Sequence, residues 1–169
     1  GYIVVAVDHA YDAYLTIFDD GSLADYRSKA EDGLTVEEFW AVRTPQLATR
    51  TADIHFLLEV MTARQARGES PWANMDLTRI GNFGHSYGGA TSIMAASTDS
   101  RIKATLALDG WMLPIPDDTI DAGLATPFVY IGRSSWEDPL NYQKLDSLLD
   151  HRQGNATRIL WEDAKHRAH

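Results

Sequence analysis

The feature that most constrains the fold of this chain is a glycine-rich turn between a strand-like run and a helix-compatible run. Residues 84–88 read Gly-His-Ser-Tyr-Gly, after the run 79–83 and before the run 88–97. A G-x-S-x-G pattern in this setting is typical of a sharp bend that lifts a serine above the edge of a parallel sheet. Glycines allow close backbone approach where a Cβ would collide. We therefore predict that Ser86 is a nucleophile and that the Tyr87 amide faces a developing oxyanion.

The rest of the chain alternates between strand-like and helix-like segments. We expect strands at 2–7, 79–83, 104–108, 128–132 and 157–161, and helices at 35–43, 45–68, 88–97 and 141–152. Strands that alternate with helices imply a mainly parallel sheet with helices on both faces. The expected fold class is therefore α/β.

Local signals divide the N-terminal part further. Thr35 and Glu38 have the spacing of a capping box, in which each side chain satisfies a free amide of the first helical turn. Pro45 is expected to end that helix and begin a second one, because proline disfavours a helical residue before it. The segments 8–33 and 114–123 are interpreted as loops, since turn-forming residues punctuate them.

A nucleophilic serine needs a base that is itself held by an acid. When the serine lies on a strand–turn–helix bend, the acid and then the histidine follow it in the chain. Asp109 directly follows the run 104–108, and catalytic groups gather at the carboxyl ends of parallel strands. The more usual place is after 128–132, where the first carboxylates are Glu137 and Asp138. Asp109 is favoured, and the other two remain alternatives.

Three histidines follow the acid: His151, His166 and His169. His166 lies in the loop after the last expected strand, where a base would enter the site, and is favoured. His151 falls within an expected helix, and His169 remains an alternative. A metal site at His166 and His169 is disfavoured because no third ligand stands at a recognisable spacing. We expect no metal and no cofactor.

Composition narrows the classes of function. The 169 residues are 44% hydrophobic and 23% charged, as in an ordinary globular domain. A net charge of −9 argues against a nucleic-acid partner and against simple adhesion to anionic lipid. The absence of cysteine excludes disulfides, thiolate zinc sites and cysteine nucleophiles. Oligomeric state stays open.

Three segments together resemble the platelet-activating factor acetylhydrolases of the α/β-hydrolase superfamily, including bacterial relatives. They are 84–89, 106–112 (Leu-Ala-Leu-Asp-Gly-Trp-Met) and 164–166 (Ala-Lys-His). In that family the acid stands one strand earlier than usual, which agrees with Asp109.

The resemblance implies a serine hydrolase that cleaves short acyl esters, such as the acetyl group of a phospholipid, without metal. Ser86 would be the nucleophile, Asp109 the acid, His166 the base and Tyr87 an oxyanion amide. Shortly after Asp109, Trp111 and Met112 are expected to border the substrate pocket.

The ends of the chain predict a partial α/β-hydrolase domain over 1–169, lacking the N-terminal strands and the last helix. The family's second oxyanion amide comes from a His-Gly loop upstream of the matching segment, and nothing here corresponds to it. Localisation stays open, and a secreted or periplasmic protein is compatible with the sequence. Aromatic residues in 8–33 are candidates for packing this loop onto the body of the domain, for contact with an apolar acyl chain, or for transient contact with a lipid surface. Alternative functions are a cutinase-like polyester hydrolase, a dienelactone-hydrolase-like esterase, or an inactive fragment.

Overall fold

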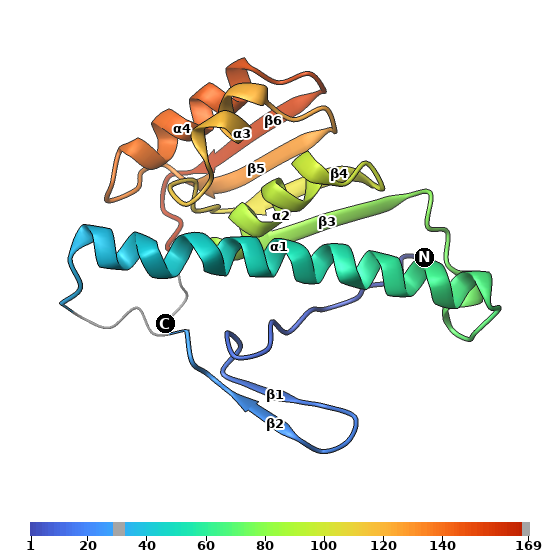
Figure 1. The fold of residues 1–169 in the computed structure, drawn as a ribbon. Coiled ribbons are helices and arrows are strands. Elements are labelled where there is room, and N and C mark those ends of the chain that lie inside the picture. Colours follow the sequence, from blue (N-terminus) through green and yellow to red (C-terminus); the bar gives the residue numbers. More distant parts are fainter. Residues whose placement is uncertain (29–32, 167–169) are drawn as a thin grey trace. The chain divides into compact units, whose positions relative to one another are not determined.

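The computed structural model describes residues 1–28 and 33–166, in two compact units, 1–75 and 76–169 (Figure 1). Each unit is described by itself. His169, the alternative base, lies outside the described residues.

The C-terminal unit is built on a parallel sheet of four strands in the order β3-β4-β5-β6. The strands are β3 (Ile80–His85), β4 (Ile102–Leu108), β5 (Phe128–Arg133) and β6 (Ala156–Trp161). Their register pairs His85 with Leu108 and Leu108 with Ile131, so the strands end at one edge of the sheet. Four of the predicted strands and the α/β class are therefore confirmed.

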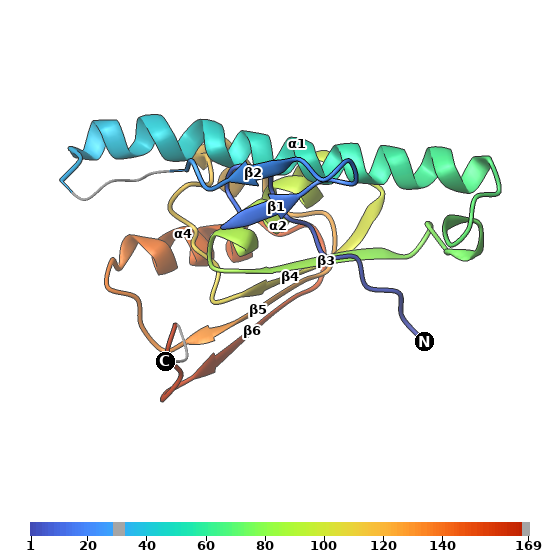
Figure 2. The ribbon, with the colours of Figure 1, turned by 90° about the horizontal axis from the view of Figure 1, so that it is seen from below.

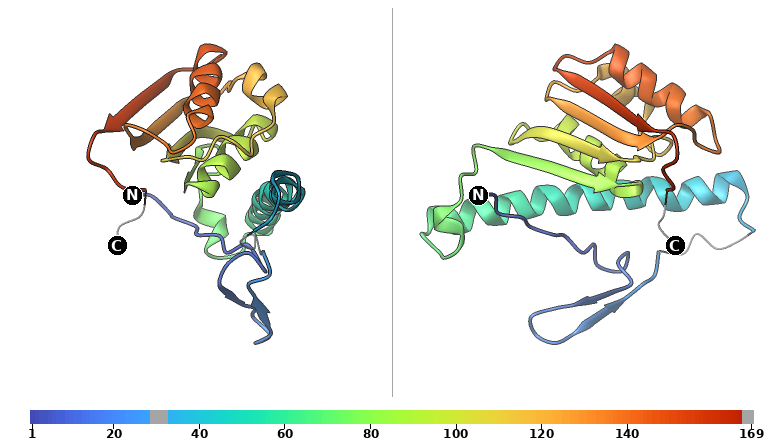
Figure 3. Two further views of the ribbon diagram at one scale, coloured as in Figure 1. Left: turned by 90° about the vertical axis from the view of Figure 1, so that its left-hand side faces the viewer. Right: turned by 180° about the vertical axis from the view of Figure 1, so that it is seen from behind.

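Three helices cover one face of this sheet: α2 (Tyr87–Thr98), α3 (Asp117–Ala122) and α4 (Leu140–Asp150) (Figure 2; Figure 3, left). The expected helices on both faces are therefore not supplied by this unit alone, whose helices lie on one face. The strand order runs in one direction across the sheet. Because each strand–helix–strand crossover is right-handed, connections that advance in one direction place all their helices on the same side.

The core of this unit lies between the sheet and those helices. Ala90 and Ile93 of α2 have no exposed surface, and neither do Ala107 and Tyr130 of the sheet. On β3, partly buried and exposed positions alternate, and Phe83 is 62% exposed. The helix-covered face therefore supplies the packing that holds the strand ends in place.

The N-terminal unit contains one long helix, α1 (Val36–Ala66), followed by the short helix η1 (Trp72–Asn74). Thr35 and Glu38 form the predicted capping box. The predicted break at Pro45 is wrong, because α1 continues through it. A proline inside a helix removes one hydrogen bond, at about 3 kcal/mol, and the turns on both sides offset that cost. No helix in the described part of the chain is long and apolar enough to cross a membrane.

A small antiparallel hairpin, β1 (Leu15–Ile17) and β2 (Leu23–Asp25), occupies part of the segment expected to be a loop. The strand predicted at 2–7 is not formed, and Tyr2 is fully exposed. A strand needs a neighbour for its backbone N–H and C=O groups. Among the described residues, no strand pairs with this run.

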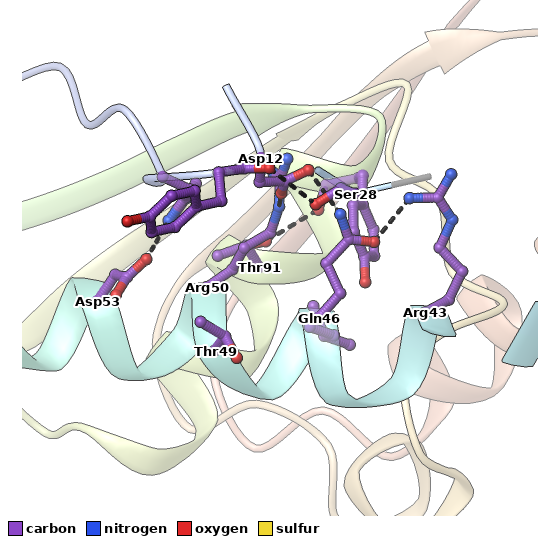
Figure 4. A network of polar contacts seen from close by, with 12 residues as sticks. Asp12, Ser28, Arg43, Gln46, Thr49, Arg50, Asp53 and Thr91 are labelled. Atoms are coloured by element: carbon purple, nitrogen blue, oxygen red, sulfur yellow. Dashed lines mark hydrogen bonds and ion pairs between the residues drawn. The ribbon is translucent and has the colours of Figure 1, made fainter. Parts of the chain in front are cut away.

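Polar contacts tie the segment before the hairpin to α1 (Figure 4). The Asp12 carboxylate accepts hydrogen bonds from Arg50 and, at 2.5 Å, from the amide of Gln46. His9 Nδ1 lies 2.8 Å from a carboxylate oxygen of Asp53. These contacts fix the course of the segment within the N-terminal unit.

Candidate active site

The candidate site lies at the edge where the four parallel strands end, and each strand leads to one part of it. Ser86 follows β3, Asp109 follows β4, and His166 lies in the loop after β6. The end of β5 contributes Arg133, and the loop after it contributes Trp136. Ligands of open α/β sheets gather at this edge.

Ser86 has an unusual backbone conformation, with φ 55° and ψ −115°, at the start of α2. Its N–H donates to the carbonyl of Leu108 at 2.9 Å, and its own carbonyl accepts from Gly89 at 3.0 Å and from Trp111 at 2.9 Å. A non-glycine residue at positive φ is strained and persists only where its surroundings fix it. The hydrogen bonds to β4 and to the segment after it provide that constraint.

The sharpness of the turn depends on Gly84. A Cβ there would lie 2.2 Å from the carbonyl oxygen of Gly88, far inside van der Waals contact. A Cβ on Gly88 itself would meet nothing within 4 Å. The expectation that both glycines relieve a collision therefore holds for Gly84 alone.

His166 connects the serine to the acid. Its Nε2 lies 2.9 Å from Ser86 Oγ, and its Nδ1 lies 2.5 Å from Asp109 Oδ2. An ionised carboxylate can only accept, so Nδ1 donates to Asp109. Nε2 of a neutral imidazole is then the acceptor for the Ser86 hydroxyl. The structure thus brings together the three side chains that the sequence predicted.

Asp109 is nearly buried, with 11% of its side chain exposed, and has φ 42°. Its Oδ1 accepts from the indole N–H of Trp136 at 3.0 Å and from the backbone N–H of Arg133 at 3.4 Å. Arg133 Nε lies 3.2 Å from Oδ2 as an ion pair. A Cβ on Gly132 would lie 2.9 Å from Oδ1, so that position leaves room for the carboxylate.

Sequence reasoning missed Arg133 and Trp136. The available signal was the segment after β5, where an acid is usual and where this chain instead has an arginine and a tryptophan before its first carboxylate. Hydrogen-bond donors at the place where the catalytic acid is usual indicate that the acid follows another strand.

Aromatic rings surround the histidine. The rings of His85 and Trp136 lie 4.7 Å and 4.9 Å from that of His166, between centroids. The Tyr87 and Trp111 rings form a neighbouring pair at 5.4 Å. These rings shield the imidazole and shape the surroundings of the serine.

Met112 does not border an open pocket, contrary to expectation. It has no exposed surface, and its backbone N–H donates to the side-chain oxygen of Asn141 at 2.6 Å. Tyr130, also buried, donates its hydroxyl to the carbonyl of Gly110 at 3.3 Å, and burial raises the pKa of Tyr130. The segment after Asp109 therefore turns into the core, and of the two expected pocket residues only Trp111 keeps exposed surface.

The alternative site residues lie in other surroundings. Asp138 accepts from the backbone N–H of Leu140 at 2.9 Å, at the start of α4. His151 is exposed at the end of α4, where its Nδ1 lies 2.9 Å from the Ser147 carbonyl oxygen. The described residues contain no group of three or more potential metal-ligating side chains.

The sequence matches a known protein family. The family described as platelet-activating factor acetylhydrolase, isoform II, matches residues 1–168. A platelet-activating factor acetylhydrolase of Gallus gallus is 25% identical over 173 residues, covering 88% of this chain and 41% of that protein. One from Canis lupus familiaris is 30% identical over 165 residues, covering 86% and 36%. This chain spans less than half the length of these relatives.

The fold is found in solved structures. A ferulic acid esterase from Streptomyces cinnamoneus superposes with a TM-score of 0.70 at 22% identity, covering 94% of this chain and 42% of that one. The parallel sheet, the helices on it and this likeness identify the α/β-hydrolase fold. With the family match over nearly its whole length, the chain belongs to the platelet-activating factor acetylhydrolase, isoform II, family.

Proposed function

We propose that this chain carries the nucleophile, base and acid of a serine ester hydrolase that removes short acyl groups, such as the acetyl group of a phospholipid. The observation that carries the proposal is the hydrogen-bonded chain from Asp109 through His166 to Ser86. Membership of an acetylhydrolase family supports a small acyl group.

The first step is acylation. His166 Nε2 takes the hydroxyl proton as Ser86 Oγ attacks the ester carbonyl, and Asp109 stabilises the imidazolium and fixes its orientation. The carbonyl π electrons move onto oxygen, which the amide of Tyr87, at the positive end of α2, would stabilise. The tetrahedral intermediate collapses, and the alcohol leaves with the proton from His166.

The second step is deacylation. Water gives a proton to His166 and attacks the acyl-Ser86 carbonyl, and the carboxylic acid leaves as Oγ regains its proton. No redox partner or metal enters this balance. One oxyanion amide is proposed from this chain, and losing one such donor costs about 10²–10³ in turnover.

Hydrolysis of p-nitrophenyl acetate tests the proposal, measured on this chain and on a version extended towards the length of its relatives. Ser86→Ala is expected to lower turnover by about 10⁶. Ser97→Ala is the matched control, because Ser97 is exposed near the end of α2 and, among the described contacts, donates its hydroxyl to the local carbonyl of Met94. Activity that is absent from the extended version, or unchanged in Ser86→Ala, would contradict the proposal.

The substrate class is tested with a series of p-nitrophenyl esters of increasing acyl length, together with a phospholipid that carries an sn-2 acetyl group. We expect kcat/KM to fall as the acyl chain lengthens. A rate that rises towards long chains would instead indicate a lipase-like substrate.

A further inference from the structure

The end of β5 and the loop after it make contacts to Asp109 that the proposed reaction leaves unexplained. Trp136 Nε1 and the Arg133 backbone N–H both donate to Oδ1, at 3.0 Å and 3.4 Å. Arg133 Nε lies 3.2 Å from Oδ2, the oxygen that also faces His166. Both side chains of this ion pair are mostly buried, with 21% of Arg133 and 11% of Asp109 exposed. Little solvent therefore screens these contacts.

We propose that Arg133 and Trp136 are positioning residues, which hold Asp109 in the orientation that serves His166 and balance its charge. The inference rests on the proposed function, since it concerns the same site. Trp136 occupies Oδ1, which leaves Oδ2 for the imidazole.

Trp136 contacts both the acid, Asp109, and the base, His166. The Trp136 ring meets the His166 ring edge-on, at 4.9 Å and 68°. The Arg133 guanidinium lies over the Trp136 ring, 4.7 Å from its centroid. Tyr142 donates its hydroxyl to the Arg133 carbonyl. The loop therefore holds its own donors in place, so that they can fix the plane of the carboxylate.

Strand order explains why this loop has the role. β5 lies between β4 and β6 in the sheet, so its loop lies between Asp109 and the loop of His166. An acid placed after β4 must reach the base past the end of β5. Donors from the intervening loop can then touch both partners, whereas an acid on β5 itself would need no such bridge.

The charges around Asp109 and His166 determine the direction of the expected pH shift. Asp109, after β4, bonds the imidazole, and Arg133, at the end of β5, pairs with the same carboxylate oxygen. The ring of His85, at the end of β3, lies tilted against the imidazole at 35°. Two tyrosines near the carboxylate, Tyr130 and Tyr142, have pKa values raised by burial and stay neutral. A cation beside the shared oxygen disfavours a second positive charge nearby. Its removal is expected to keep the base protonated to higher pH.

The test measures kcat, KM and the pH profile of kcat/KM with p-nitrophenyl acetate in the full-length protein. Trp136→Phe keeps the ring and removes the donor, and it is expected to lower kcat about tenfold with KM unchanged. Arg133→Gln is expected to move the midpoint of the acid limb up by about half a pH unit or more. Arg133→Lys, which keeps the charge, should restore the midpoint.

Trp161→Phe and Arg152→Gln are the matched controls, since both residues are exposed and neither contacts Asp109 in the described structure. The proposal is overturned if Trp136→Phe leaves kcat unchanged, or if Arg133→Gln lowers kcat without moving the acid limb. If Arg133→Gln does not fold, the Trp136→Phe result decides alone. If activity depends on Ser86 but is unchanged by the substitutions at Trp136 and Arg133, only this inference is contradicted. If activity persists in Ser86→Ala, the proposed function itself is contradicted.

Discussion

Asp109 and Asp12 are two carboxylates in similar surroundings, yet only Asp109 leads to a nucleophile. Each side chain is 11% exposed and pairs with an arginine, Arg133 for Asp109 and Arg50 for Asp12. Asp109 bonds a histidine that in turn bonds a serine hydroxyl. Asp12 instead accepts from Arg50 and Gln46, and Gln46 accepts in turn from Arg43, a cation and not a nucleophile (Figure 4). A buried, paired carboxylate is therefore not by itself a sign of function. The chain of contacts beyond it is what differs.

Backbone strain does not separate the two regions either. Asp109 has φ 42° and Ser86 φ 55°, but Tyr11, next to Asp12, has φ 65°. The Tyr11 carbonyl accepts from the backbone N–H of Arg27 at 2.7 Å, which fixes the loop there. A residue with positive φ thus occurs in each unit at a turn that hydrogen bonds hold in place. Only the turn at Ser86 presents a nucleophile.

Removal of the charge on each carboxylate gives the largest expected difference. Asp109→Asn should lower kcat by about 10⁴, because an amide can hold the imidazole in the wrong tautomer. Asp12→Asn should leave kcat within about twofold, and so should Asp138→Asn. Rates with p-nitrophenyl acetate decide this, and a large loss in Asp138→Asn instead of Asp109→Asn would move the acid to the loop after β5.

Gly132 offers a smaller, purely steric way to disturb Asp109. A Cβ there would lie 2.6 Å from a ring carbon of Tyr130 and 2.9 Å from Asp109 Oδ1. Gly132→Ala should lower kcat by about 10² through misplacement of the carboxylate and lower the free energy of unfolding by about 1–3 kcal/mol.

Gly81→Ala is its matched control. That Cβ would meet only the Ala104 carbonyl oxygen, at 3.5 Å, which is ordinary contact. Equal loss of activity in both variants would show that the sheet tolerates no alanine, and that the effect is not specific to Asp109.

Much of the C-terminal unit could be predicted from sequence because its signals are local. Apolar runs gave the four strands, and the strand–turn–helix context singled out Ser86. Strand ends then predicted Asp109 and His166, which the structure brings together with Ser86, while their roles remain a proposal. The contacts of Trp136 and Arg133 had no local pattern, since each joins Asp109 across more than twenty residues.

The N-terminal unit was harder to predict because local preferences competed there with longer-range ones. Pro45 indicated a helix end, but the turns on either side continue through it. The apolar run 2–7 indicated a strand, but a strand also requires a neighbour, which the described residues do not supply. The hairpin over 15–25 had only the turn residues around Gly21 as a signal.

The pH dependence of the free energy of unfolding tests what Asp12 contributes to the N-terminal unit. Burial alone would raise the pKa of Asp12, but the hydrogen bonds and charge of Arg50, with Ser28 and Gln46, hold it below its ordinary value. A lowered pKa means that the contribution is present above the ordinary value of about 3.9 and is lost as pH falls through the folded value. Asp12→Asn should therefore cost about 2 kcal/mol near neutral pH and less in acid.

Urea unfolding at several pH values, followed by circular dichroism, measures this difference. The other carboxylates titrate in both the parent protein and Asp12→Asn, so their contributions cancel in the difference between the two free energies of unfolding. A difference that stays constant from neutral pH to about pH 2 would show that shape, and not charge, is what Asp12 contributes.

The smallest expected effect comes from the capping box of α1. The backbone N–H of Thr35 donates to Glu38 at 2.8 Å, Glu38 N–H donates back to Thr35 Oγ1 at 3.2 Å, and the first contact lowers the pKa of Glu38. Thr35→Ala should cost about 1 kcal/mol of unfolding free energy, whereas Thr35→Ser should retain most of it. Neither should change kcat, because the contacts of the cap are local to the first turn of α1. A loss of kcat in Thr35→Ala that Thr35→Ser rescues would break the comparison, since polar contacts of the N-terminal unit would then influence catalysis as well as stability.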